Sequence, residues 1–368
     1  MRFTCPTPAL MEGLQIVTRA LTARTTNPIL EGVLLEAQSG RIQLTASDER
    51  LTITTRVDCD VREFGRGVLP GKLFSEIVRR LPTDTTEVRM SDRFLFTLTS
   101  GASRLNVAGQ DPDLYPALPK IDGDCEITLP QDMLRDMIQK TEFAIASDDA
   151  REVLTGCLLE IAGGDVTMVA LDGFRMAYKR AKCSDVLENV SAIIPGRAVG
   201  DIGKLLSGEE DAFATLNFNG NKLQIRLQKT DVYVMLVDGE YINYRRILPT
   251  SFNMRAIVNL EALRRAIDRA ALLAREGSNN LIRFYLHDGI LEIEANSQMG
   301  DAHEEMEVEI DGSELAIAFN VRYMMDVVRA IDAESVEMSF TSSLSPCVIS
   351  PVGDGDYVHL VLPVRTAY

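Results

Sequence analysis

The feature that most constrains the fold of this chain is an internal repeat. Residues 40–46 begin with Gly, alternate apolar with other residues and end in Ala, and the same pattern returns at 164–170 and 289–295. The offsets between the copies are 124 and 125 residues. Each copy follows another short apolar run across a turn, so each predicts a β-hairpin. A pattern repeated at this spacing predicts an array of similar units.

A second repeat lies downstream of each hairpin and has helical spacing. It covers residues 71–81, 196–206 and 320–331, and its apolar positions match in steps of 125 residues. They are Phe74, Ile77 and Leu81, then Val199, Ile202 and Leu206, then Met324, Val327 and Ile331. Each unit also opens with a helical pattern, the second one preceded by Pro130, a residue favoured at helix starts.

Three units divide the 368 residues into segments of about 123, a comfortable size for a domain. Turn-forming residues cluster at 114–124 and 245–253, where boundaries are expected. We therefore predict an α+β chain of three repeated domains, each with two helices packed on antiparallel β-sheet. The predicted domains are 1–120, 126–248 and 249–368.

The composition argues against several classes of protein. Hydrophobic residues make up 46% of the chain and charged residues 25%, and no stretch approaches the roughly 20 apolar residues of a membrane span. The N-terminus lacks a signal-peptide pattern. Six cysteines are scattered without a CxxC motif, which argues against a zinc knuckle. We expect reduced thiols, a cytoplasmic protein and no membrane partner.

The net charge of −16 argues against nucleic acid as a partner unless the basic residues are segregated. They are: the six helical windows together carry +5, which leaves −21 for the rest of the chain. The downstream helix repeats a basic pair, opposite its apolar stripe, in all three units: Lys72 and Arg79, Arg197 and Lys204, Arg322 and Arg329. Solvated helix faces are the alternative, but the threefold register favours a surface that binds duplex DNA.

The chemistry of that surface is predicted to be simple. The chain has no zinc-finger or RNP motif, no Trp and only 6% aromatic residues, so base stacking is not expected to dominate. Contacts to phosphate, indifferent to sequence, are expected instead.

No catalytic constellation is evident. The three histidines are far apart, and His303 followed by Glu304 does not complete an HExxH zinc motif because Glu307 occupies the second His position. No phosphate-binding loop or nucleophile turn occurs, so we predict no catalytic residue, metal or cofactor. Two alternatives stay open: a metal-dependent hydrolase that uses distant carboxylates, and a protein scaffold that does not bind DNA.

Five local motifs identify a family resemblance. They are residues 27–30 (NPIL), 172–176 (DGFRM), 244–249 (YRRILP), 319–321 (FNV) and 361–365 (VLPVR). With the three units, they make the chain resemble the bacterial beta sliding clamps, the DNA polymerase III beta subunits, along essentially its whole length.

The resemblance implies a non-enzymatic processivity factor of DNA replication. Two chains would form a head-to-tail homodimer, a closed ring with helices facing duplex DNA and sheets outside. A pocket between the second and third domains would capture short motifs of the replicative polymerase, the clamp loader and repair proteins.

The resemblance also implies site residues. The pocket positions are Leu154, Leu171, Gly173, Phe174, Arg175, Met176, Ile242, Arg246, Ile247, Leu344, Pro346, Leu360, Val361, Leu362, Pro363, Val364 and Arg365. Phe174, Ile242 and Leu171 stand where His, Pro and Thr are familiar, so the pocket is expected to be more apolar. Arg24 and Lys72 match DNA contacts, whereas Asp148 stands in place of Gln. Leu105 and Val107 are expected to meet Leu272 and Leu273 at the dimer interface.

The residues themselves also support a pocket. Ile242 and Ile247 flank Arg245 and Arg246 near the second boundary, and residues 360–364 form an apolar run at the end of the chain. These two segments could combine into an apolar groove, with Arg175, Arg246 and Arg365 facing polar or acidic parts of a bound peptide. Ordinary buried strands are the alternative for part of the set.

Overall fold

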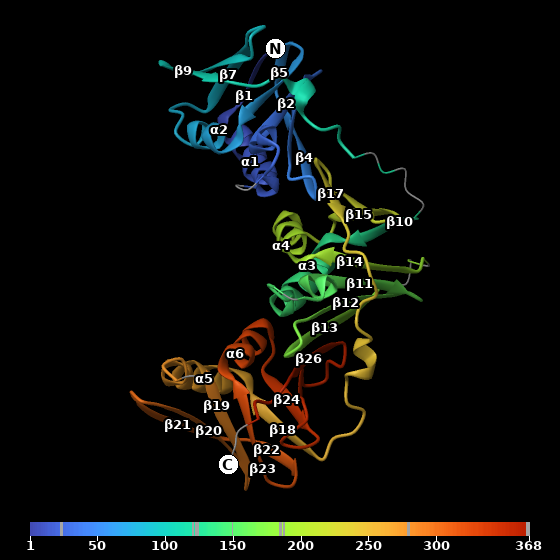
Figure 1. Ribbon diagram of the computed structural model, residues 1–368, viewed down its shortest axis with the longest axis vertical. Coiled ribbons are helices and arrows are strands. Elements are labelled where there is room, and N and C mark those ends of the chain that lie inside the picture. The colour runs from blue at the N-terminus through green and yellow to red at the C-terminus, as the bar shows by residue number, and fades with distance from the viewer. Residues whose placement is uncertain are drawn as a thin grey trace. The chain divides into compact units, whose positions relative to one another are not determined.

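The computed structural model describes residues 1–22, 25–119, 121, 125–148, 150–183, 186, 188–277 and 280–365. The chain divides into two compact units (Figure 1). The first comprises Met1–Asp132 and Asp201–Leu236, and the second Met133–Gly200 and Val237–Tyr368. Because the middle of the chain contributes to both units, the domain boundaries derived from the repeat remain a prediction.

The first unit contains two antiparallel sheets. One has the order β5 (Asp60–Glu63), β1 (Arg2–Pro6), β7 (Thr85–Met90), β8 (Leu95–Ser100) and β9 (Ser103–Ala108). The other has the order β10 (Cys125–Pro130), β15 (Phe213–Asn219), β16 (Lys222–Arg226), β17 (Thr230–Met235), β4 (Leu51–Asp58), β3 (Arg41–Ser47), β2 (Gly32–Gln38) and β6 (Gly65–Pro70). Helices α1 (Thr7–Val17) and α2 (Gly71–Val78) pack beside each other against these strands (Figure 1).

The second unit contains the other two sheets. The larger has the order β14 (Val190–Pro195), β11 (Gly156–Ala162), β12 (Asp165–Leu171), β13 (Arg175–Lys182), β26 (Tyr357–Val361), β25 (Cys347–Pro351), β24 (Ser335–Phe340), β18 (Met254–Asn259) and β22 (Glu309–Gly312). The smaller has the order β21 (Gly300–Glu307), β20 (Ile290–Ser297), β19 (Leu281–His287) and β23 (Leu315–Asn320).

The remaining helices are α3 (Gln131–Thr141), α4 (Gly196–Leu205), α5 (Leu260–Ala274) and α6 (Val321–Ala330). Short 3-10 turns occupy Thr18–Ala20, Pro28–Glu31, Pro112–Leu114, Glu142–Ala144, Glu152–Thr155 and Tyr244–Arg246. None of the six α-helices in the described part of the chain has the length and hydrophobicity that crossing a bilayer requires.

The predicted hairpins are confirmed in all three repeats. They are β2–β3, β11–β12 and β19–β20, each paired antiparallel across a short turn. The turns end in Gly40, Gly164 and Gly289, whose φ angles are 73°, 80° and 78°. Residues with a side chain rarely adopt positive φ, which explains why the repeat begins with glycine.

The predicted helices form, but several end earlier than their apolar patterns. Leu21 and Ile145 lie after the 3-10 turns that follow α1 and α3, where the backbone is extended. Their side chains pack on the first residues of α2 and α4: a Cβ on Gly71 would lie 2.4 Å from Leu21 Cδ1, and one on Gly196 2.8 Å from Ile145 Cγ2. The apolar period therefore continues past the helix because the residue after the turn still faces the core.

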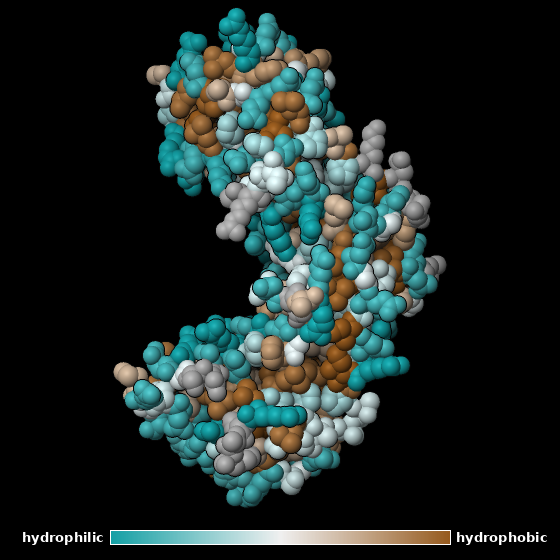
Figure 2. All heavy atoms as spheres, in the orientation of Figure 1, coloured by the Kyte–Doolittle hydropathy of each residue, from teal (hydrophilic) through white to brown (hydrophobic). Residues whose placement is uncertain are grey.

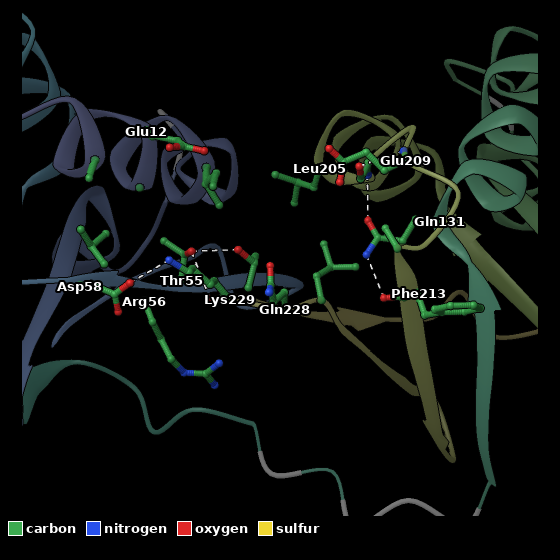
Figure 3. A pocket seen from close by; sticks show the side chains of 18 of the residues that line it. Glu12, Thr55, Arg56, Asp58, Gln131, Leu205, Glu209, Phe213, Gln228 and Lys229 are labelled. Carbon is green, nitrogen blue, oxygen red and sulfur yellow. Dashed lines mark hydrogen bonds and ion pairs between the residues drawn. The ribbon is translucent and has the colours of Figure 1, made fainter. Parts of the chain in front are cut away.

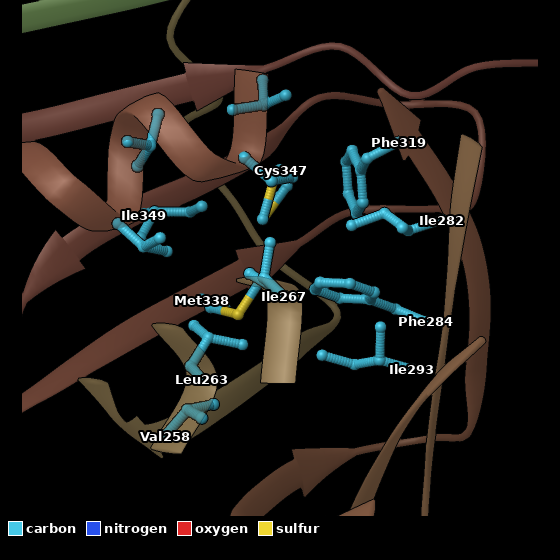
Figure 4. Close-up of a cluster of buried hydrophobic side chains, with 14 of the residues drawn as sticks. Val258, Leu263, Ile267, Ile282, Phe284, Ile293, Phe319, Met338, Cys347 and Ile349 are labelled. Atoms are coloured by element: carbon cyan, nitrogen blue, oxygen red, sulfur yellow. The ribbon is translucent and has the colours of Figure 1, made fainter. Parts of the chain in front are cut away.

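The core of the second unit shows how the repeat buries its apolar positions. Leu263 and Ile267 of α5 pack with Phe284, Phe319 and other side chains of the strands beneath, all almost completely buried (Figure 4). Arg264 of α5 donates hydrogen bonds to the carbonyls of Val328 and Ile331 at the end of α6, at 3.0 and 3.2 Å. These bonds satisfy carbonyls that a helix end leaves without partners, so the two helices are held side by side.

The sheet order repeats as strictly as the sequence. Four strands of one repeat (β6-β2-β3-β4) join four of the next (β17-β16-β15-β10) through β4 and β17. The second large sheet joins β14-β11-β12-β13 to β26-β25-β24-β18-β22 in the same way, through β13 and β26. The two smaller sheets, β23-β19-β20-β21 and β9-β8-β7-β1-β5, have the orders of these two halves but no partner half in the described chain.

Candidate DNA and partner-peptide interfaces

The repeated basic positions all lie on exposed helix surface. Lys72, Arg79, Arg197, Lys204, Arg322 and Arg329 are exposed, whereas the apolar positions Phe74, Val199 and Met324 on the same helices are almost fully buried. The predicted division into a buried apolar face and an exposed basic face is therefore present in all three copies. Such a face can contact phosphates, and contacts to phosphate do not depend on the base sequence.

Arg79 and Arg329 have carboxylate neighbours. Arg79, the residue after α2, bonds Glu76 of that helix, and Arg329 Nη2 lies 3.0 Å from Asp268 Oδ1 of α5. All four side chains are about half exposed. Exposed ion pairs contribute little, so a phosphate could compete for both guanidinium groups.

Two other residues bear on the DNA prediction. Arg24 lies outside the described residues. Asp148 is exposed in the bend that follows the 3-10 turn after α3. A carboxylate there would repel phosphate, in keeping with the expectation that it weakens that contact.

The predicted peptide pocket converges on one apolar cluster in the second unit. Leu154, Leu171, Met176 and Leu360 are buried together, and Leu362 packs against them. Ile242 and Ile247, from the segment after β17, cover the same cluster. In Figure 2, hydrophobic atoms form a stripe over the region where Figure 1 draws β11–β13 and that segment. The structure thus brings together residues that are up to about 200 positions apart in the chain.

The sequence did not single out the tyrosines that complete this cluster. Tyr244 is buried in it, its hydroxyl donates to Glu160 Oε2 at 2.6 Å, and its ring lies 5.8 Å from that of Tyr178. Burial and the Glu160 carboxylate raise the pKa of Tyr244 well above its usual range. Tyr244 belongs to the YRRILP motif, which was noticed in the sequence. Only the apolar and basic residues of that motif were assigned to the pocket.

Val361 does not face the pocket. Side chains alternate along β26, so Leu360 faces the pocket cluster while Val361 is fully buried in the core beneath α5 and α6. The expectation that all residues from 360 to 364 line one groove is therefore wrong for Val361. The reason is the period of two in a strand, which sends neighbours to opposite faces.

Arg175 is committed to the fold rather than offered to a ligand. Its side chain is only 11% exposed, and its guanidinium bonds Asp172, Asp326 and the carbonyl of Phe143, the last at 2.7 Å. It also stacks over Tyr323, 4.8 Å from the ring centroid. The expectation that Arg175 is available to a bound peptide is corrected, because its donors are taken up by the turn before β13 and by α6.

The other predicted pocket residues are exposed or half-buried. Phe174 and Leu344 are exposed, and the Phe174 ring stacks on Tyr323 at 5.8 Å. Arg246 and Arg365 are exposed and carry the positive charge expected at the pocket. The remaining positions lie on the turn before β13, before β25 and in the final segment: Gly173 is exposed, and Pro346, Pro363 and Val364 are half-buried. The final segment is anchored by Leu362 N–H, which donates to the Phe174 carbonyl at 2.8 Å.

The predicted dimer residues lie on separate elements. Leu272 is 67% exposed and Leu273 is half-buried, both on α5. Leu105 is half-buried on β9, the edge of its sheet, whereas Val107 is only 7% exposed and pairs with Phe96 in the core of the first unit. Leu105 and Leu272 therefore provide apolar surface for the predicted dimer contact, whereas Val107 is buried in the core of the first unit.

The first unit also contains a large open hollow beside α1 and β4, with a volume of about 970 Å³ (Figure 3). Its wall mixes carboxylates such as Glu12 and Glu209 with Arg56 and Lys229. Lys229 pairs with Asp58 at 2.8 Å. Charges of both signs on an open wall do not define one ligand class.

One group of described residues has metal-ligand geometry. Glu292, Glu294 and His303, on β20 and β21, have ligand atoms within 4.8 Å of one another. The neighbouring Glu305 carboxylate raises the pKa of His303. We assign no metal to this group, because it is partly exposed and such carboxylate groups commonly occur without an ion.

The buried cysteines Cys5, Cys157 and Cys347 behave as structural residues. Burial raises the pKa of the Cys5 and Cys157 thiols to about 12. Thiols held neutral in this way are poor nucleophiles and poor metal ligands.

The known proteins to which this chain is similar match it over its full length. Family models match residues 1–119 (DNA polymerase III beta subunit, N-terminal domain), 128–243 (central domain) and 245–365 (C-terminal domain). The beta sliding clamp of Staphylococcus aureus is 34% identical, and that of Staphylococcus epidermidis 33%, each alignment covering all of both chains. The crystal structures of the sliding clamp from Bacillus subtilis and of the DNA polymerase III subunit beta from Pseudomonas aeruginosa are 31% and 29% identical, cover all of both chains and give TM-scores of 0.95 and 0.94.

Proposed function

Because the chain belongs to the family of bacterial DNA polymerase III beta subunits, the beta sliding clamps, we propose that two copies close head to tail into a ring around duplex DNA. The family is a non-catalytic processivity factor of DNA replication, and DNA and a polymerase are its partners. We assign the three clamp domains of this chain to residues 1–120, 126–248 and 249–368. The cytoplasm is the proposed location, where the six cysteines would stay reduced.

The observation that carries the ring is the pair of unjoined sheet halves. Inside the chain, β4 joins β17 and β13 joins β26, each time connecting a four-stranded half to the half of the next repeat. By the same order, β21 of one copy would join β9 of a second copy. Both are edge strands, and edges left open invite pairing with another chain. A head-to-tail contact used twice closes a two-membered ring.

The side chains near these edges are complementary. β21 carries Asp301, Glu304, Glu305 and Glu307, whereas Arg104 projects from β9. Leu105 near one edge and Leu272 near the other supply apolar surface. Opposite charge around an apolar centre favours one mode of association over the alternatives.

For DNA, we propose that the exposed basic residues of α2, α4 and α6 face the duplex through its phosphates. Lys72, Arg79, Arg197, Lys204, Arg322 and Arg329 form this set. Arg24, which lies outside the described residues, is proposed as a further phosphate contact on the family resemblance alone. Phosphate contacts release counterions, so retention is expected to fall steeply with salt and to be indifferent to base sequence.

For partners, we propose that the cluster around Met176 and Leu362 binds short motifs of the replicative polymerase, the clamp loader and repair proteins. A buried apolar floor with exposed Phe174, Leu344, Arg246 and Arg365 at its rim suits a peptide with Leu and Phe anchors and a polar residue. Micromolar affinity, about −8 kcal/mol, is expected for a few buried anchors.

Light scattering and DNA retention test this function together. The purified protein is expected at twice its chain mass of 40.7 kDa, and loaded protein should stay on nicked circular DNA but leave linearised DNA. Replacing Lys72, Lys204 and Arg322 by Ala should shorten retention and reduce the salt slope by roughly one per lost phosphate contact. The matched control replaces exposed Arg41, Arg226 and Arg255, on sheet strands, with the same loss of charge. A strict monomer, or equal retention by both triple variants, would contradict the proposal.

A further inference from the structure

We infer that the first unit carries a second peptide-binding site, the repeat counterpart of the pocket around Met176 and Leu362. We call it the Met235 pocket; it is a hollow of about 310 Å³ whose wall includes Arg50, Pro119, Ile121, Lys222 and Met235. A volume of this size holds one anchor side chain and its neighbours. The inference rests on the peptide-binding role proposed above for the second unit.

The turn that opens both pockets has the same construction. In the first unit, Asp48 Oδ1 accepts the N–H groups of Arg50 and Leu51 at 3.0 and 2.7 Å. In the second, Asp172 Oδ1 accepts those of Phe174 and Arg175 at 2.9 and 3.0 Å. The residue after each aspartate has positive φ, 75° at Glu49 and 87° at Gly173. Glu49 adopts a conformation that costs a non-glycine residue energy, so the turn is imposed by the fold rather than by local preference.

The strand beside each turn leaves the sheet at the same point. Leu51 pairs with Val234 and Arg175 pairs with Val361. The next residue then donates its N–H to the turn, Met235 to the Arg50 carbonyl and Leu362 to the Phe174 carbonyl, both at 2.8 Å. Met235 therefore occupies the backbone position of Leu362, the residue that packs on the peptide-binding cluster.

The outer wall of each pocket comes from the segment that leads to the next repeat. In the second unit it comes from Ile242 and Ile247, in the segment that leads from the second repeat to the third. In the first unit, Ala117, Pro119 and Ile121 occupy the segment that leads from the first repeat to the second. Ala117 lies 125 residues before Ile242, which is the repeat spacing.

The side chains differ, and the difference selects the ligand. Arg50 stands in place of Phe174, and Thr52 in place of Met176, so these two positions are less apolar in the Met235 pocket. Lys222 pairs with Met235 in the sheet, and its side chain is exposed at the wall that also includes Arg50 and Glu49. Met235 itself is 40% exposed beside this hollow, so its side chain is accessible to a ligand. The occupant that fits is an extended acidic peptide with one apolar anchor.

Each pocket contains one methionine, so a single labelled sample can report both. The protein would be labelled with ¹³C at the methionine methyl groups, and Met176→Leu and Met235→Leu would identify the two signals. The probe is a synthetic acetylated heptapeptide that carries Gln, two Asp residues and a Leu-Phe pair. We expect both signals to shift, with the Met235 signal requiring about tenfold more peptide because its pocket has fewer anchors.

The charge requirement is tested with Lys222→Glu. This variant should weaken binding at the Met235 pocket about fivefold or more and leave the Met176 titration unchanged, because reversing an exposed charge acts locally. The matched control is Lys229→Glu, an exposed lysine of the same unit outside the Met235 pocket, which should change neither titration.

The outcomes separate this inference from the function it rests on. A Met235 signal that stays still at millimolar peptide while the Met176 signal saturates would overturn the second pocket alone. Neither signal moving would overturn both proposals. A Met235 shift that Lys222→Glu leaves unchanged would also overturn the inference, because the peptide would then not be using the cationic rim.

Discussion

His359 should make this protein lose stability on acidification, by an amount that its burial sets. The side chain lies on β26, is fully buried, and neither ring nitrogen has a hydrogen-bond partner among the described residues. Its ring packs 5.7 Å from Phe143 and 4.4 Å from Tyr357. The Tyr357 hydroxyl donates toward the carbonyls of Lys140 and Ala330, at 3.3 and 3.2 Å, and is not hydrogen-bonded to either nitrogen of His359.

This burial lowers the pKa of His359 from its ordinary 6.5 to about 3. Between these two values the unfolded chain binds a proton that the folded chain does not, so stability falls as the pH falls below 6.5. At pH 5.0 this one group lowers the free energy of unfolding by about 2 kcal/mol, whereas at pH 7.5 its effect on that free energy is negligible. Solvent does not screen this effect, because the ring is completely buried.

The assay is urea unfolding at pH 7.5 and pH 5.0, at one protein concentration, for the natural protein and His359→Phe. Phenylalanine keeps an aromatic ring beside Phe143 and Tyr357 but cannot titrate. Any packing cost of the larger ring affects both pH values equally, so the comparison uses only the change with pH. The natural protein should lose about 2 kcal/mol more than the variant on acidification.

The matched control is His303→Gln, because His303 is exposed and its pKa is raised, not lowered. A neighbouring carboxylate that raises the pKa makes the folded state bind the proton more tightly, so this variant should not reduce the loss on acidification. Equal pH dependence in the natural protein and His359→Phe would refute the argument and would mean that His359 is hydrated or partnered.

Three further predictions follow from the interfaces. Leu273→Asp should cost several kcal/mol at the proposed dimer contact, since it buries an unpaired carboxylate, and sedimentation should find monomers; a variant that stays dimeric would place the contact elsewhere. Leu362→Ala and Met176→Ala should each weaken peptide binding about tenfold in a folded dimer, as fluorescence titration would report, and undiminished binding in both would misplace the pocket. Arg175→Met should lower the unfolding free energy by about 3 kcal/mol in urea because Asp172 and Asp326 lose their partner, and a change below about 1 kcal/mol would show that this cluster is not structural.

Much of the fold followed from periodicity alone. The three hairpins and the buried faces of α2, α4 and α6 are local patterns, and local patterns depend on residues within one or two turns of each other. The glycine of each hairpin turn could be assigned for the same reason, since positive φ is a property of one residue. Helix ends were predicted less well, because Leu21 and Ile145 remain apolar after the helix ends to pack on Gly71 and Gly196.

For the candidate sites, too, local sequence patterns determined some features and the tertiary structure decided others. Which residues are apolar or basic, and that they recur at steps of 125, is written in the sequence, and so the exposed basic helix faces were predicted from it. The pocket positions came from the family resemblance, and they remain a proposal. Which side chain faces which way needed the tertiary structure. Val361 enters the core and Leu360 the apolar cluster around Met176 because β26 pairs with β13 in one register, and Arg175 is withdrawn from solvent because α6 brings Asp326 to it. These contacts join residues more than 150 positions apart, and no local pattern encodes the register of strands so distant, since it is decided by the packing of both faces at once.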